Sequence, residues 1–217
     1  MQKQTLIAVG LAAAGLLAFG QAQAVPLLNG FTVAPGVTVT ANNGSVSNHA
    51  DQGIQGKGVN GEISGNEALI FNWAGGKTLS SIQFGLLYNG MEFGDVMEKA
   101  KVSFYGANDV LIGYRTLSTT LSDTDAIWSG AGAIVDNNSP ASEPGAAVWT
   151  VSNPFGNTSI GKLKFEVATG ACGTGRCNNP SDYIVTQINA VPEPGTYALM
   201  IAGLAGVGFV ARRRRKA

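Results

Sequence analysis

The chain has 217 residues, and its 14 basic and 14 acidic side chains give it a formal net charge of zero. The balance is uneven, because residues 25–191 hold 8 of the basic and 13 of the acidic side chains, a net charge of about −5. A mildly acidic body argues against a nucleic acid partner, since proteins that bind DNA or RNA present a basic face.

Residues 1–24 have the pattern of a secretory signal peptide. Lys3 precedes an apolar stretch over residues 6–19, and Ala22-Gln23-Ala24 forms a small-x-small cleavage site. Such a segment is removed during export and does not belong to the folded protein. We therefore expect export through the Sec translocon and cleavage after Ala24. An uncleaved signal anchor is the alternative.

Residues 25–190 have the length of one domain and the pattern of an all-β protein. Glycine is abundant, at 30 of 217 residues, and short alternating runs recur between Gly, Asn, Ser and Pro clusters. This pattern is typical of a sandwich or barrel. About nine or ten strands are predicted, enough for two packed sheets. They cover residues 27–33, 36–40, 67–73, 78–87, 99–106, 110–117, 131–135, 146–151, 160–168 and 183–188.

The alternation also predicts which side chains face the core. These are Leu69, Phe71, Trp73, Ile82, Phe84, Leu86, Val102, Phe104, Leu163, Phe165 and Val167. Several local predictions follow from turn residues and polarity. Residues 36–40 are expected to pair with residues 27–33, residues 41–61 to form a loop, and Gly75-Gly76 to form a turn. Residues 91–98 are expected to form a helical turn, and residues 106–109 the turn of a hairpin.

Cys172 and Cys177 are predicted to form one local disulfide, the usual arrangement in an exported chain. A zinc site is not expected, because His49 is the single histidine. Residues 56–61 satisfy G-x-G-x-x-G but lack a preceding strand and a following helix, so no dinucleotide cofactor is expected. Asp95 and residues 123–125 are candidate ligands of a structural calcium ion, since calcium takes oxygen ligands, and this alternative stays open.

Carboxylate pairs and exposed aromatic residues are the other candidates for a site. Glycoside hydrolysis uses two carboxylates, and the nearest candidates are Glu62 with Glu67, Asp95 with Glu98, and Asp123 with Asp125. All lie in turn-like contexts that favour solvated charges. Trp128, in an expected loop, is the candidate sugar contact, because an amphipathic ring can stack on a sugar face. Tyr88, Tyr105 and Tyr114 lie beside the inward residues, whereas Trp73 and Trp149 are expected in the core.

Residues 191–217 combine three unlike elements. Pro192-Glu193-Pro194 is expected to be extended, because both prolines fix φ and remove a donor. The uncharged run over residues 197–211 would span only about 22 Å as a helix, short of the usual membrane span. Arg212, Arg213, Arg214 and Arg215, followed by Lys216, form a cytoplasmic stop. These features favour a temporary hold in the membrane, and a plain C-terminal anchor is the alternative.

In this order, the three elements resemble the PEP-CTERM sorting signal of Gram-negative bacteria. The resemblance covers residues 192–217. It implies that exosortase, a membrane-embedded enzyme similar to cysteine proteases, recognises the segment and removes it near Pro192, Glu193 and Pro194. It also implies an exported protein, delivered to the cell surface or released, often alongside exopolysaccharide.

The body resembles, over about 60 residues, the β-sandwich domains found among PEP-CTERM proteins. The segments that carry the resemblance are residues 56–65, 67–71, 81–84, 94–95 and 102–105. It implies a jelly-roll fold like that of carbohydrate-binding modules, and it implies no catalytic residues. The leading hypothesis is a non-enzymatic matrix or surface protein. A lectin-like carbohydrate-binding module and a glycan-active enzyme are the alternatives.

Overall fold

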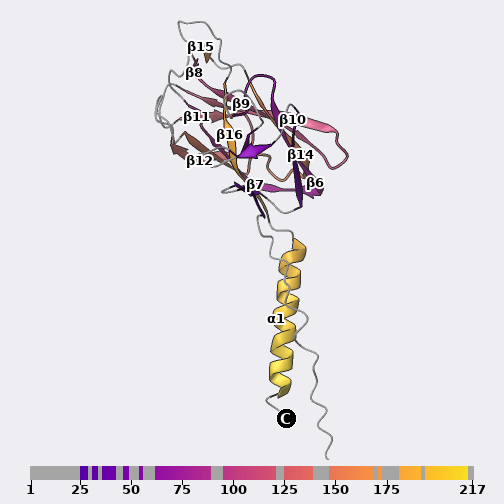
Figure 1. Ribbon diagram of the computed structural model, residues 1–217. Coiled ribbons are helices and arrows are strands. Elements are labelled where there is room, and N and C mark those ends of the chain that lie inside the picture. The colour runs from indigo at the N-terminus through magenta and orange to yellow at the C-terminus, as the bar shows by residue number, and fades with distance from the viewer. Residues whose placement is uncertain are drawn as a thin grey trace, which may run out of the picture. The chain divides into compact units, whose positions relative to one another are not determined.

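Residues Ala24–Val191 form one structural unit, which is built from β-strands, whereas Pro192–Ala217 belongs to a second unit (Figure 1). The structure is a computed structural model. It describes residues 25–28, 31–33, 36–42, 46–48, 54–55, 62–88, 95–120, 125–138, 147–168, 171–172, 181–191 and 194–214.

The first sheet has eight strands. Its order is β1 (Val25–Leu28), β2 (Phe31–Val33), β16 (Ile184–Ala190), β7 (Leu79–Gly85), β13 (Val148–Ser152) and β12 (Ala133–Asn138). Two short strands, β4 (Ser47–Asn48) and β5 (Ile54–Gln55), join it beside β16. β16 pairs with β2 in parallel and with β7 antiparallel, so the last strand of the unit lies inside the sheet.

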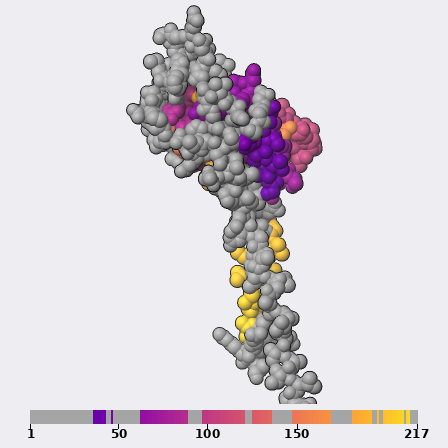
Figure 2. All heavy atoms as spheres, viewed as in Figure 1, coloured from indigo at the N-terminus to yellow at the C-terminus, as the bar shows by residue number. Residues whose placement is uncertain are grey.

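The second sheet has six antiparallel strands. Their order is β11 (Ala126–Trp128), β10 (Leu111–Thr119), β9 (Lys99–Tyr105), β14 (Ile160–Val167), β6 (Ala68–Lys77) and β3 (Val37–Ala41). A separate pair joins β8 (Asp95–Met97) to β15 (Ala171–Cys172). In Figure 2 the indigo and violet surface of β3 and β6 adjoins the pink surface of the β9–β10 hairpin, with a small orange area of β14 between them.

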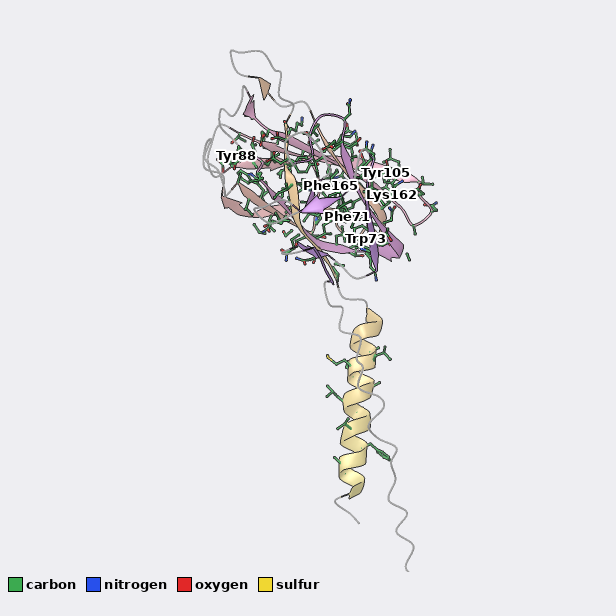
Figure 3. The ribbon with its side chains drawn as sticks, viewed as in Figure 1. Phe71, Trp73, Tyr88, Tyr105, Lys162 and Phe165 are labelled. Atoms are coloured by element: carbon green, nitrogen blue, oxygen red, sulfur yellow. The ribbon has the colours of Figure 1, made fainter. Side chains whose placement is uncertain are left out.

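The two sheets share one apolar core, which makes the unit a β-sandwich. Phe84 from the first sheet contacts Phe165 from the second, with ring centroids 6.0 Å apart. Phe165 in turn packs edge-on against Phe71 at 5.4 Å (Figure 3). Trp149 and Tyr183 are fully buried in the same cluster. Offset and edge-on aromatic pairs of this kind add to the free energy gained from burial alone.

Most of the predicted core residues are confirmed. Leu69, Phe71, Trp73, Ile82, Phe84, Leu86, Val102, Phe104, Leu163 and Phe165 are all buried. Val167 is half-buried and packs against the core. The hairpin of β9 and β10 is also confirmed, with Tyr105 opposite Leu111 across the turn. Local alternation therefore identified the inner face of each long strand correctly.

Other local predictions are wrong. β3 pairs with β6 rather than with residues 27–33, because strand pairing is decided by the whole sheet. Gly75 and Gly76 lie inside β6, whose register against β14 shifts between Ile160 and Lys162. The expected helical turn over residues 91–98 includes the strand β8, and the expected loop over residues 41–61 includes β4 and β5. Trp128 lies on a strand, β11, rather than in a loop.

Candidate functional site

The C-terminal segment contains a single described helix, α1 (Pro194–Arg214), of 21 residues. Pro194 is its first residue, so the expectation that this proline lies outside any helix is wrong. A proline suits this position, because the first N–H groups of a helix have no partner within it. Pro192 and Glu193, the first two residues of the motif, lie outside the described residues.

Large apolar side chains lie exposed on every side of α1. They are Leu199, Met200, Ile201, Leu204, Val207 and Phe209. A helix that is apolar all round is suited to an apolar environment, whereas a helix with water on one side has a polar face and an apolar face. Arg212, Arg213 and Arg214 form its last turn, where positive charge interacts favourably with the helix dipole. Arg215 lies outside the described residues.

In the described part of the chain, no helix is both long enough and apolar enough to cross a membrane.

The second candidate site lies on the outer face of the six-stranded sheet. Along β9, residues Ala100, Val102 and Phe104 face the core, so the alternate positions face outward. The same holds for β14, whose Leu163 and Phe165 face the core. Five of the outward side chains of these two strands, with Tyr114 of β10, form what we call the lysine–tyrosine face. It consists of Lys99, Lys101, Tyr105, Tyr114, Lys162 and Lys164.

Strand pairing brings these residues together. Lys162 is opposite Tyr105, and its Nζ lies 3.8 Å from the centre of the Tyr105 ring (Figure 3). Lys101 Nζ lies 5.7 Å from the centre of the ring of Tyr114, which is 60% exposed. An ammonium over an aromatic face is attracted by the ring quadrupole. Each of the two rings therefore has a lysine ammonium group close to it, and both rings are partly open to solvent.

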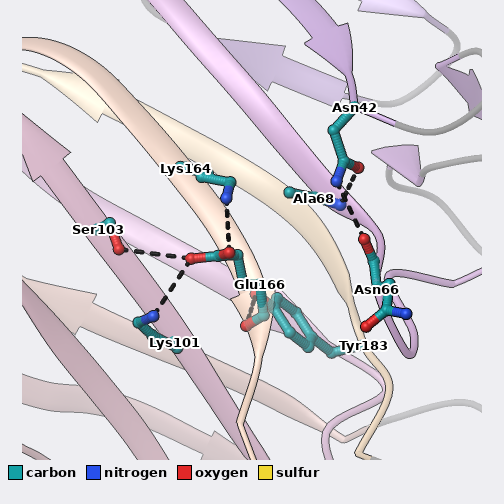
Figure 4. A network of polar contacts seen from close by, with 8 residues as sticks. All are labelled: Asn42, Asn66, Ala68, Lys101, Ser103, Lys164, Glu166 and Tyr183. Carbon is teal, nitrogen blue, oxygen red and sulfur yellow. Dashed lines mark hydrogen bonds and ion pairs between the residues drawn. The ribbon is translucent and has the colours of Figure 1, made fainter. Parts of the chain in front are cut away.

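Glu166 is the counter-ion of this face. Its Oε1 lies 2.6 Å from Lys164 Nζ, and its Oε2 lies 3.4 Å from Lys101 Nζ (Figure 4). Ser103 Oγ donates a 3.5 Å hydrogen bond to the same Oε2. Burial alone would raise the pKa of Glu166, but the hydrogen bond from Lys164 and the charges of both lysines outweigh it and lower the pKa. The carboxylate thus stays ionised at mildly acidic pH. Asp109 forms a further ion pair with Lys162.

Trp128, the candidate sugar contact, packs against the core. Its ring lies 6.3 Å from the rings of both Phe84 and Phe155. Its Nε1 donates a 2.8 Å hydrogen bond to the carbonyl of Ala131 and a 3.3 Å one to that of Pro154. These contacts give the indole a structural role, and its role toward a sugar stays a prediction.

The carboxylate candidates are not brought together as pairs by any described contact. Glu98 is buried, accepts a hydrogen bond from the main-chain N–H of Tyr88, and has its own N–H bonded to Thr119 Oγ1 at 2.8 Å. Glu98 therefore connects the start of β9 with the end of β10 and with the residues that follow β7. Asp125 is exposed. Asp123 and the side chain of Asp95 lie outside the described residues, as do most of the residues on which the calcium prediction depends.

In the described part of the chain, no three His, Cys, Asp or Glu side chains are grouped so that they could hold a metal ion. His49, Cys177, residues 56–61, Ala22 and Ala24 lie outside the described residues. Cys172 lies on β15, and its disulfide with Cys177 stays a prediction.

The lysine–tyrosine face was not predicted from the sequence. Its signal was present in part, since Lys162, Lys164 and Glu166 alternate with core residues along one strand. The missing information was that β14 lies beside β9, which is about 60 residues earlier in the chain. No local pattern carries that pairing.

Comparison with known proteins identifies the C-terminal segment. Residues 190–215 match the model of the PEP-CTERM protein-sorting motif. The search of curated proteins gave no match, and the search of solved structures gave none either, so the jelly-roll likeness stays an expectation. The matched residues include Pro192, Glu193 and Pro194, the helix α1 and the arginines up to Arg215. The chain therefore carries a PEP-CTERM sorting motif at residues 190–215, and this motif implies recognition by an exosortase and export to the cell surface.

Proposed function

We propose that the chain is an exosortase substrate whose β-sandwich works outside the cell in association with exopolysaccharide, without catalysing a reaction. The observation that carries this proposal is the position of the sorting motif. The sandwich unit ends at Val191, whose N–H donates a 2.8 Å hydrogen bond to the carbonyl of Thr78. The motif follows at once, so a cut near Pro192 leaves every strand of the sandwich in place.

We propose further that α1 holds the precursor in the inner membrane until it is cut. The support is the apolar surface on all sides of the helix, followed by a run of cations. Lys and Arg beside an apolar segment favour the cytoplasmic side. The sandwich, which precedes the helix in the chain, would then lie on the opposite side of the membrane, where cleavage releases it.

The double variant Pro192→Ala/Pro194→Ala tests the processing step. We expect the precursor to stay uncut in the membrane fraction, whereas the wild-type chain reaches the medium or cell surface without its arginine-rich end. Intact-mass analysis of both fractions measures this. Gly195→Ala is the matched control, because a methyl group there meets no neighbouring atom within 4 Å. A released wild-type protein that retains Arg212–Arg215 would contradict the proposal.

Polysaccharide binding by the sandwich is a second candidate function, and the lysine–tyrosine face favours it. Flat, partly exposed tyrosine rings suit the apolar faces of sugars, and lysines suit charged groups on them. A glycan-active enzyme is distinguished by an assay for new reducing ends on the exopolysaccharide of the organism that produces this protein. A binding protein releases none.

A further inference from the structure

The lysine–tyrosine face concentrates positive charge in an acidic domain. Residues 25–191 contain 8 basic side chains, and four of these, Lys99, Lys101, Lys162 and Lys164, lie outward on the adjacent strands β9 and β14. Arg115 is excluded, because it pairs with the core residue Val102 and so lies on the inner side of β10. Half of the cations of a domain with net charge about −5 thus share one sheet face.

Few acidic groups oppose these lysines. Glu166 is the one acidic residue on either strand, and Asp109 reaches Lys162 from the turn between β9 and β10. Glu166 sits between Lys101 and Lys164 and contacts both. A carboxylate bound from outside would find the same two ammonium groups already oriented toward an anion. Glu166 therefore marks the position and the chemistry of an exchangeable anion.

From this arrangement we infer that the lysine–tyrosine face binds an acidic polysaccharide of the polyuronate class. The sugar rings pack on Tyr105 and Tyr114. The carboxylates of the sugars replace the Glu166 carboxylate as the ion-pair partners of Lys101 and Lys164. This inference rests on the proposed role of the sandwich in exopolysaccharide and names the chemical class of its ligand.

The composition of the face favours a polyuronate over a nucleic acid. The face contains no arginine, the residue that most often recognises phosphates and bases, and two carboxylates reduce its charge. Its two aromatic rings lie next to lysine ammonium groups, at 3.8 and 5.7 Å. Aromatic rings and ammonium groups that lie side by side on one face of a sheet suit a chain of acidic sugar rings laid across the strands.

The test uses the full-length chain in mild detergent and affinity gels that contain polygalacturonate, dextran, duplex DNA or the exopolysaccharide of the organism that produces this protein. We expect retardation by polygalacturonate and none by neutral dextran. Lys162→Gln/Lys164→Gln should weaken binding about tenfold, since each exposed charge pair contributes about two- to fivefold. Glu166→Gln should strengthen it about two- to fivefold, because both lysines lose their internal partner. Raising NaCl from about 20 to 200 mM should weaken binding by screening.

Lys77→Gln is the matched control. It removes one positive charge from β6 at a position opposite Ile160, which faces the core, and should leave binding unchanged. Thermal unfolding of every variant verifies that the fold is retained. Retardation by polygalacturonate that is equal in the wild type and the lysine double variant would overturn this inference and leave the exopolysaccharide role intact. Preference for DNA would also overturn it. No retardation by any polysaccharide would overturn the exopolysaccharide role itself.

Discussion

The hydroxyl group of Tyr183 connects the two sheets of the sandwich. It donates a 2.9 Å hydrogen bond to the main-chain carbonyl of Glu166 on β14, while Tyr183 itself directly precedes β16 of the other sheet (Figure 4). The side chain is fully buried. Burial raises the pKa of Tyr183 well above its ordinary value, and the negative charge of Glu166 raises it further. The native state therefore keeps the proton in alkaline solution.

This raised pKa makes stability depend on alkaline pH. Unfolded tyrosine ionises near pH 10, whereas the native Tyr183 does not, so the free energy of unfolding should fall as the pH rises above about 10. Tyr183→Phe should cost about 1 kcal/mol at pH 7 through the lost hydrogen bond, and should make the alkaline decline shallower. Urea unfolding between pH 7 and pH 11.5 measures both effects. Tyr114→Phe, at an exposed ring, is the control. Parallel pH curves for Tyr183→Phe and the wild type would contradict this prediction.

At the scale of elements, β14 and the β9–β10 turn are in close contact at a glycine. A Cβ atom on Gly161 would lie 2.5 Å from Ala107 Cα and 2.6 Å from Gly106 O. Both are main-chain atoms, which cannot move aside as the end of a flexible side chain does. The glycine thus lets the turn approach the strand, and this contact holds Asp109 and Lys162 close enough to form their ion pair.

Gly161→Ala should therefore destabilise the sandwich by about 1–3 kcal/mol, the usual cost of overpacking. Urea denaturation of the variant and the wild type measures the difference. Gly113→Ala, on the same hairpin, is the control, because its methyl group would meet only the ring of Phe104 at 3.3 Å. A smaller loss is expected there, since a ring edge can shift by a few tenths of an ångström. Equal losses at the two positions would count against the close contact.

At the scale of the whole molecule, the order of strands constrains where the chain can be cut. β16 is the last strand before the sorting motif, yet it lies between β2 and β7 and buries Ile184, Val185 and Ile188. Removing it would leave one edge of β7 unpaired and open the core. Processing that leaves a folded sandwich must therefore cut after residue 190.

Two shortened chains examine this constraint. A chain that ends at Val191 should unfold cooperatively at the same temperature as the full-length chain, because every strand of the sandwich is present. A chain that ends at Asp182 should show no cooperative unfolding, because it lacks β16. Near-ultraviolet circular dichroism during heating distinguishes the two results. Cooperative unfolding of the shorter chain would show that β16 is dispensable.

Local sequence patterns determined the parts of this protein that depend on neighbours along the chain. The alternation in β14 predicted its inner face, residues 99–117 predicted the hairpin, and the order of prolines, apolar run and arginines predicted the sorting motif. Each of these signals is complete within about 30 residues, so no tertiary information was required.

The tertiary structure alone decided which strands lie side by side. The partner of β3, the central place of β16 and the juxtaposition of β9 with β14 all join segments that are distant in the sequence. The physical reason is that a strand can pair with any edge that also buries its apolar face. The sequence therefore determined the sorting signal of this protein, whereas strand pairing decided which of its side chains share a surface.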